Sequence, residues 1–127
     1  PNEIFWHIKK IRFSFLAKRF RTQENEDLYY WYVNNLLNRH VLLPSGEVTF
    51  QDRGNPSGQV STTMDNNMVN IWLQAFEYIH LNRLDLETAK VSWEKYDSLI
   101  YGDDRLNTTP HLPDNYVEKV IAFYHDI

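Results

Sequence analysis

The sequence predicts a mixed α/β (α+β) fold in which an antiparallel hairpin packs against helices. Apolar residues recur at helical spacing in several separate stretches, whereas two other stretches carry short β-prone runs around turn-forming residues. Hydrophobic residues make up 43% of the 127 residues and aromatic residues 15%, so the chain has enough apolar surface to bury a core. Together these observations predict a globular chain that is long enough for one domain of ordinary size.

The first 50 residues of the chain are expected to contain two helices and a hairpin. Residues 3–20 carry apolar side chains at helical spacing, and Asn25 or Asp27 is a suitable cap for a second helix. The predicted buried positions of these two helices are Ile4, Ile8, Ile11, Phe15, Tyr29, Tyr32, Val33, Leu36 and Leu37. The period then changes, and the β-prone runs at 41–43 and 48–50, around Pro44-Ser45-Gly46, predict a hairpin.

Helices and a second hairpin are expected in the rest of the chain. A loop over 54–58, dense in turn residues, leads into a third helix, and Asp85 caps a short helix over 86–94. The expected buried side of the third helix consists of Met64, Met68, Ile71, Ala75 and Ile79.

The second hairpin and a last helix complete the predicted order. A strand from Tyr96 to Tyr101 is followed by a tight turn at Gly102-Asp103 and a return strand over 105–108. Asp114 is a suitable cap for the last helix, whose apolar positions are Val117, Val120, Ile121 and Tyr124.

Charge is unevenly distributed along the chain. The net charge is −4, but residues 1–22 carry six basic side chains against Glu3 alone: Lys9, Lys10, Arg12, Lys18, Arg19 and Arg21. Such a tract suits phosphates or an anionic membrane surface, and the alternative is a solvated helix, because the basic side chains scatter around the helix axis. The absence of cysteine excludes disulfides and thiolate metal sites, and no run approaches the roughly 20 apolar residues of a membrane span.

Two adjacent carboxylates, Asp103 and Asp104, lie at the tip of the second predicted hairpin. Like charges side by side repel, and a hard cation such as Mg²⁺ or Mn²⁺ removes that repulsion while keeping positions open for substrate phosphates. Gly102 suits a turn in which a side chain would collide. The alternative is that the two aspartates form an ordinary solvated turn.

A second polar constellation precedes them, with Ser57-Gly58 in the loop and Thr62 and Asn66 four residues apart on the third helix. An amide both donates and accepts hydrogen bonds, so Asn66 suits a ribose hydroxyl. A glycine loop that opens a helix supplies backbone N–H groups to an anionic ligand. The alternatives are a turn residue at Ser57, a helix cap at Thr62 and an exposed polar side chain at Asn66.

The two constellations together resemble motifs B and C of the RNA-dependent RNA polymerases of positive-strand RNA viruses. The residues that carry the resemblance are Ser57-Gly58-x-x-x-Thr62-x-x-x-Asn66, followed by Tyr101-Gly102-Asp103-Asp104. The sequence around both motifs looks most like the astrovirus branch. The resemblance implies a palm fragment, with Asp103 as the main Mg²⁺ or Mn²⁺ ligand and Asp104 assisting. Asn66 would contact the ribose 2′-OH with support from Thr62, and Ser57 and Gly58 would form a mobile loop. Asn67 departs from many relatives, which carry Ser or Thr there.

The resemblance also implies how the chain is organised and what it contacts. Residues 1–38 would be palm helices that follow motif A, residues 39–54 a hairpin in the fingers, and residues 55–127 palm with motifs B and C and the start of motif D. The implied activity is two-metal nucleotidyl transfer from an NTP to an RNA 3′-OH. The implied partners are RNA template, nascent strand, NTPs and the rest of the polymerase, in the host cell cytoplasm at viral replication complexes.

A carboxylate of motif A is missing from this sequence, because residues 1–20 contain no aspartate. The chain also begins at Pro1 without Met, so we expect a piece of a longer polymerase, which does not polymerise by itself. The motif D lysine is expected beyond Ile127. Two alternatives remain at this point: a non-catalytic palm-like module that binds RNA or protein, and a reverse transcriptase. The latter would need a bulky side chain at position 66 to exclude ribose.

Overall fold

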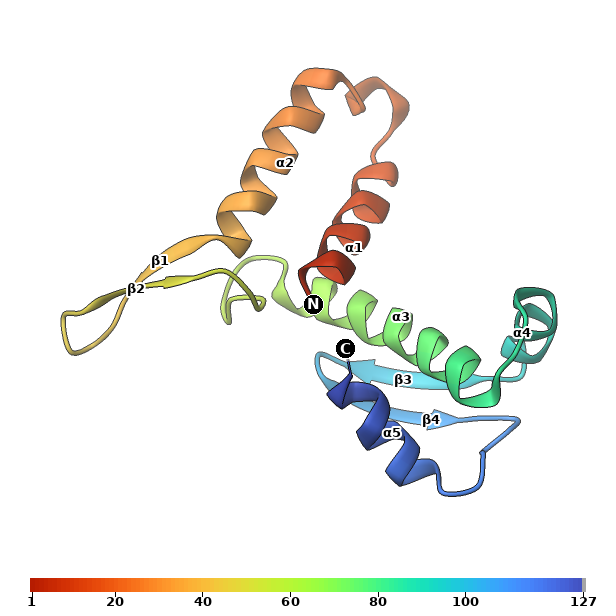
Figure 1. Ribbon diagram of the computed structural model, residues 1–127. Helices are drawn as coiled ribbons and strands as arrows, with labels where there is room; N and C mark the ends of the chain where they lie inside the picture. The colour runs from red at the N-terminus through yellow and green to blue at the C-terminus, as the bar shows by residue number, and fades with distance from the viewer. Residues whose placement is uncertain (127) are drawn as a thin grey trace. The chain divides into compact units, whose positions relative to one another are not determined.

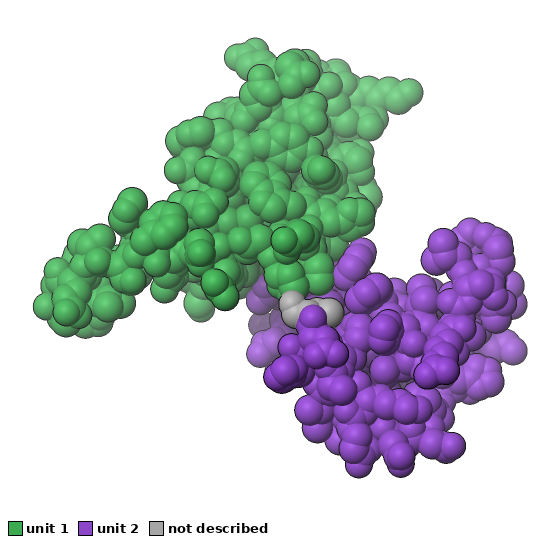
Figure 2. Space-filling view, in the orientation of Figure 1, with its two compact units in different colours: residues 1–65 green, residues 66–127 purple. Residues whose placement is uncertain are grey.

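The computed structural model describes residues 1–126 and confirms a mixed helix and strand fold, with two small antiparallel sheets packed against helices (Figure 1). The chain divides into two compact units, residues 1–65 and 66–127, which Figure 2 distinguishes by colour. The elements are α1 (Asn2–Ser14), η1 (Lys18–Phe20), α2 (Gln23–Leu37), β1 (Arg39–Leu42), β2 (Val48–Gln51), α3 (Thr62–Asn82), α4 (Leu86–Trp93), β3 (Asp97–Tyr101), β4 (Asp104–Thr108) and α5 (Tyr116–His125). Within residues 1–126, no helix is both long and apolar enough to cross a membrane.

The first unit is built on α1 and α2, which lie side by side (Figure 1). Their shared core consists of Ile4, Phe5, Ile8, Phe13, Val33 and Leu37. The prediction of one helix over residues 3–20 is wrong, because α1 ends at Ser14. The Ser14 hydroxyl donates to the Ile11 carbonyl at 2.6 Å, and Phe15 N–H bonds back three residues, which tightens the last turn. Phe15 is 72% exposed, so burial does not extend the helix there.

The start of α2 also differs from the prediction. Thr22, rather than Asn25 or Asp27, is the N-cap, and its hydroxyl accepts from Asn25 N–H at 3.3 Å. The helix therefore begins at Gln23, which places acidic side chains in the first turn, where the helix dipole favours them. Of the predicted buried face, Val33 and Leu37 are fully buried, whereas Tyr32 is exposed.

The β1–β2 hairpin confirms the prediction for the region of residues 39–54. Its register pairs Arg39 with Gln51 and Leu42 with Val48. Gly46 has φ +86°, a conformation that glycine adopts without strain and that closes the turn after Pro44-Ser45. Arg39 ties the base of the hairpin by donating to the Gln51 side chain at 2.7 Å. The assignment of this hairpin to the fingers stays a prediction.

In the second unit, the buried face of α3 is polar, which corrects the predicted apolar side. Asn70, Gln74 and Glu77 are buried together with Tyr78, whereas Ile71 is 38% exposed. The reason is that the groups opposite α3 are polar: backbone groups of the turn between β3 and β4, hydroxyls at the start of β3, and tyrosines of α5. Buried groups of this kind need hydrogen-bond partners, and amides and a carboxylate supply them.

The remaining elements follow the prediction except at the start of α5. Asp85 caps α4 by accepting from Glu87 and Thr88 N–H at 3.1 and 3.0 Å, and β3 and β4 pair in register from Asp97–Thr108 to Tyr101–Asp104. Asn115, at φ +55°, is the N-cap of α5 and makes no side-chain cap bond, so the prediction of Asp114 is wrong. The buried side chain of α5 is Phe123, which packs against Phe76 at 5.4 Å between ring centroids, whereas Val117 and Ile121 are exposed.

Candidate functional site

The two aspartates lie on a two-residue hairpin turn. Tyr101 pairs with Asp104, which leaves Gly102 and Asp103 as the central residues of the turn. Gly102 has φ +64°, whereas Asp103 keeps a negative φ, and this is the pattern of a type II′ turn with glycine first. Both aspartates are exposed. The β3–β4 pairing therefore directs two adjacent carboxylates away from the core.

Amides of α3 hold the backbone of this turn. Asn67 Oδ1 accepts from Gly102 N–H at 2.6 Å, and Asn70 Nδ2 lies 3.2 Å from the carbonyl oxygens of both Gly102 and Asp103. Gln74 Nε2 donates to Asn70 Oδ1 at 2.9 Å. These contacts fix the acidic turn against one face of a 21-residue helix.

An open groove lies beside the turn, with a volume of about 410 Å³. Its lining residues are Asn66, Val69, Asn70, Leu73, Gly102, Asp103, Arg105 and Tyr124. The structure thus brings Asn66 and Asp103, predicted separately from two motifs, to the same groove. Asp104 is exposed at the start of β4 and does not line this groove among the residues that the structure describes.

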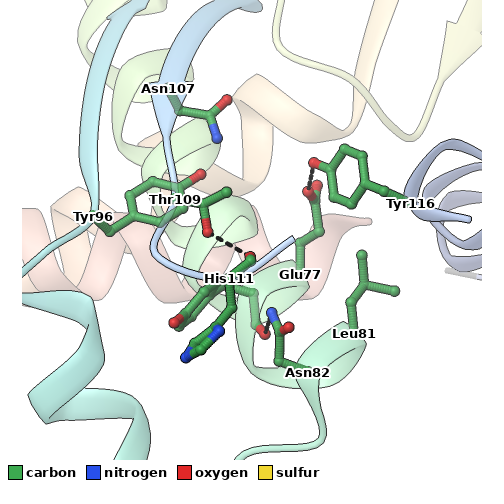
Figure 3. A pocket seen from close by; sticks show the side chains of 9 residues that line it. Glu77, Leu81, Asn82, Tyr96, Asn107, Thr109, His111 and Tyr116 are labelled. Atoms are coloured by element: carbon green, nitrogen blue, oxygen red, sulfur yellow. Dashed lines mark hydrogen bonds between the residues drawn. The ribbon is translucent and has the colours of Figure 1, made fainter. Parts of the chain in front are cut away.

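A buried carboxylate, Glu77, lies behind the groove. It accepts from Arg105 Nη2 at 2.7 Å and from Tyr124 OH at 3.0 Å, and Tyr116 OH also points at it (Figure 3). Burial, together with the Glu77 charge, raises the pKa of Tyr124 to about 12. Burial opposes the charge on Arg105, but Glu77 outweighs it and raises the pKa of that guanidinium. Glu77 therefore balances a fixed positive charge that stands one residue from Asp104.

The loop that carries Ser57 and Gly58 belongs to the first unit. Pro56 to Gln59 form a turn in which Gly58 has φ +80°, and both Ser57 and Gly58 are exposed. Thr62 is the first residue of α3, and its Oγ1 lies 2.8 Å from the Pro56 carbonyl and 2.9 Å from the Gln59 carbonyl. The Thr62 hydroxyl thus fastens the turn to the start of the helix.

Asp65, which sequence reasoning missed, organises the same loop from inside the first unit. Asp65 is fully buried and accepts from Lys9 at 2.7 Å, Ser61 at 2.9 Å and Gln59 at 3.0 Å, and Arg12 also pairs with it. Burial by itself would raise the pKa of Asp65, but the hydrogen bonds from Lys9, Arg12 and Ser61 outweigh it and lower the pKa.

The cluster around Asp65 also shows what part of the basic tract at residues 1–22 does. Lys9 and Arg12 neutralise Asp65 inside the fold, so two of the six basic side chains are structural. Burial lowers the pKa of Lys9, and Asp65 opposes that shift. A sequence signal did exist, because Lys9 and Arg12 lie four residues from the apolar residues Phe13 and Ile8, respectively, and so share their helix face.

The site fits a divalent cation by the chemistry of its donors. Within residues 1–126 there is no group of three or more His, Asp or Glu side chains that could hold a metal ion. Mg²⁺ is nevertheless commonly bound through one or two carboxylates, together with waters and substrate phosphates. The exposed pair Asp103 and Asp104 supplies that part of a coordination shell.

A groove that joins a helical amide to a carboxylate turn has the chemistry to bind a sugar hydroxyl and a cation together. Comparison with known proteins identifies the family of the chain. Residues 5–127 match the family described as viral RNA-dependent RNA polymerase. This chain belongs to that family.

Among known proteins, the relatives include three viral proteins named non-structural polyprotein 1AB. The chain is 58% identical to that of ovine astrovirus 1 over 128 residues, 60% to that of human astrovirus-1 over 127 residues, and 46% to that of turkey astrovirus 1 over 134 residues. Each alignment covers 100% of this chain but only 8–10% of the relative, so the chain spans about a tenth of their length. No solved structure gives a significant match.

Proposed function

We propose that this chain supplies the cation-binding turn and the sugar-selecting helix of an RNA-directed RNA polymerase that replicates and transcribes a viral genome. In that reaction the 3′-oxygen of the nascent strand bonds to the α-phosphorus of an NTP, the hydroxyl proton is released, and pyrophosphate leaves. The observation that supports this best is that Asn66 and Asp103 line one groove of about 410 Å³. A groove of that size is in the range that accommodates a nucleotide.

Each side chain has a distinct task in this proposal. Asp103, with assistance from Asp104, would hold Mg²⁺ or Mn²⁺, and the cation would supply positive charge to the phosphate oxygens. Asn66 binds the ribose 2′-OH of the incoming nucleotide. Thr62, which fastens the turn at residues 56–59, supports the start of the helix that carries Asn66. Ser57 and Gly58 help to position nucleotide and template.

Two-metal transfer requires carboxylates on both sides of a pair of cations about 3.5–4 Å apart. Asp103 and Asp104 lie on one turn and supply one side. We therefore propose that a carboxylate from another segment of the longer protein supplies the other side, and that the 127-residue chain alone does not polymerise. Its proposed partners are RNA template, nascent strand, NTPs and the rest of the polymerase.

The test is template-dependent incorporation by the full-length polymerase that contains this chain. Asp103→Ala is expected to abolish Mn²⁺-dependent incorporation, whereas Asp97→Ala, an exposed aspartate at the other end of β3, is expected to leave it intact. Incorporation that survives Asp103→Ala would refute the assignment. Metal-independent RNA binding without any incorporation would instead favour a non-catalytic palm-like module.

The proposal extends to where the parent protein acts. We propose that it acts in the host cell cytoplasm, at viral replication complexes. Co-localisation of the parent protein with newly made viral RNA in infected cells would test it. A uniformly nuclear distribution would refute it.

A further inference from the structure

The tight turn between β3 and β4 has backbone groups that the hairpin itself does not pair. In a two-residue hairpin the ladder ends at the flanking pair, here Tyr101 and Asp104, and the polar groups of the central residues face outward. Three of them are nevertheless bonded to α3: Gly102 N–H to Asn67, and the carbonyls of Gly102 and Asp103 to Asn70. The helix therefore determines where the turn sits.

The two amides act with opposite polarity. A backbone N–H only donates, so Asn67 must present its oxygen to Gly102, whereas backbone carbonyls only accept, so Asn70 must present its nitrogen. The orientation of Asn70 is fixed from behind, because its Oδ1 accepts from Gln74 Nε2 at 2.9 Å.

The chain of hydrogen bonds continues along β3. Gln74 Oε1 accepts from Tyr96 OH at 2.9 Å and from Ser98 Oγ at 2.8 Å, so hydroxyls at the start of β3 orient the amides that hold the turn at its end. All these bonds run in one direction, from hydroxyl donors to turn carbonyls, and such chains strengthen cooperatively. Gln74 is 1% exposed, so water competes little for these groups.

Neutral amides are suited to this position for an electrostatic reason. A lysine or arginine that held the turn would neutralise the carboxylates and compete with a cation. The nearest arginine in sequence, Arg105, is instead paired with Glu77 at 2.7 Å. The turn is thus held without a charge partner that would take over the ligand role of Asp103.

We infer that Asn67 and Asn70 are positioning residues for the cation at Asp103, through the backbone of the turn. This inference rests on the proposed function of Asp103. Groups that orient metal ligands affect metal affinity or activity by about 10–100-fold when they are removed. Asn70→Ala in the full-length polymerase should therefore raise the Mn²⁺ concentration needed for half-maximal incorporation about tenfold. The NTP KM at saturating Mn²⁺ and the preference for NTP over dNTP should change less than about twofold, since neither depends on the bonds that hold the turn.

A matched control lies on the same helix. Asn82 Nδ2 donates to the Tyr78 carbonyl at 2.9 Å, which is the same chemistry without contact with the turn. Asn82→Ala should leave the Mn²⁺ requirement unchanged. A general loss of helix stability would shift both variants, whereas the positioning role predicts a shift for Asn70→Ala alone.

Because Asn67 accepts from the turn and Asn70 donates to it, the same change to aspartate at each position gives a sharper test. Asn67→Asp keeps an acceptor for Gly102 N–H, whereas Asn70→Asp removes the donor for two carbonyls, and both add one negative charge to the same helix. The Mn²⁺ requirement should stay near that of the wild type for Asn67→Asp and rise for Asn70→Asp. Equal shifts for the two variants, or no shift for either alanine variant, would overturn the inference. If the Asn70 variants do not fold, Asn67→Ala against Asn67→Asp decides, with a raised requirement expected only for alanine.

The outcome for Asp103→Ala separates the two claims. If that variant loses incorporation but the Asn67 and Asn70 variants keep the wild-type metal requirement, the positioning role fails and the proposed function stands. If Asp103→Ala still incorporates nucleotides, the proposed function itself fails.

Discussion

Lys9 Nζ donates to Asp65 Oδ2 at 2.7 Å, and the exposed fractions of the two side chains are 1% and 0%. The pair connects α1 to the start of α3 within the first unit, and Asp65 in turn holds Ser61 and Gln59 of the adjoining loop. Buried ion pairs contribute little net stability compared with apolar replacements, but loss of one partner leaves an uncompensated charge. The loop that carries Ser57 and Gly58 therefore depends on a lysine nearly fifty residues away.

The first prediction concerns that lysine. Lys9→Met keeps most of the side-chain volume but removes one charge-assisted hydrogen bond from Asp65, which keeps Arg12 as its cationic partner. We therefore expect a loss of about 1.5–3 kcal/mol in the free energy of unfolding. Lys10→Met is the matched control, because Lys10 is exposed on the same helix, and its change should stay within about 0.5 kcal/mol. Denaturant unfolding of the polymerase that contains this chain measures both. Equal effects of the two variants would show that the pair contributes nothing specific.

The second prediction concerns pH. The pKa of Asp65 is lowered in the folded protein, so its ionised form is stabilised by folding. That contribution is complete above the unfolded pKa, which lies near 4, and is lost as the pH falls through the lower folded pKa. The stability difference between wild type and Asp65→Asn should therefore shrink as the pH falls below about 4. Thermal unfolding at a series of pH values checks this, and a difference that is independent of pH would contradict it.

The third prediction concerns removal of the hydroxyl group from two tyrosines, Tyr78 and Tyr116. Tyr78 OH is buried without a hydrogen-bond partner within residues 1–126, next to a cavity of about 10 Å³, whereas Tyr116 OH donates to Glu77 (Figure 3). Tyr78→Phe should be neutral or stabilising, because it removes an unsatisfied buried group. Tyr116→Phe should destabilise by about 1.5–3 kcal/mol, because it removes a hydrogen bond to a charge. Unfolding measurements on the two variants should therefore differ in sign or clearly in size.

Much of the fold could be predicted because local signals were strong. The second hairpin follows from β-prone residues around Gly102, and α4 follows from the cap at Asp85. The last residue of α1 and the first residue of α2 could not be predicted. Neighbours of Ser14 and Thr22 are equally plausible helix ends in the sequence, and tertiary contacts decide between them.

The candidate site was predictable as separate motifs but not as a constellation. Asn66 and Asp103 stand out by residue type, yet only the fold places them on one groove. The polar buried face of α3 was not predicted, because a search for apolar periodicity assumes that buried positions are apolar. Asn67, noted only as a departure from relatives, turns out to accept from Gly102, and nothing in its sequence neighbours indicates that bond.

The last prediction separates sugar recognition from cation binding. If Asn66 binds the ribose 2′-OH, Asn66→Ala should lower the ratio of kcat/KM for NTP over dNTP about tenfold in the full-length polymerase, since about 1.4 kcal/mol corresponds to that factor. The Mn²⁺ requirement should not change, because Asn67 and Asn70 bond to the turn backbone and both stay in place in this variant.

Asn70→Ala should give the reverse result, with a raised Mn²⁺ requirement and an unchanged sugar preference, although its amide lines the same groove. Steady-state incorporation with matched NTP and dNTP series at several Mn²⁺ concentrations measures both quantities in one experiment. If the ratio of kcat/KM for NTP over dNTP stays constant in Asn66→Ala, Asn66 does not bind the sugar hydroxyl, because loss of that contact must lower the ratio.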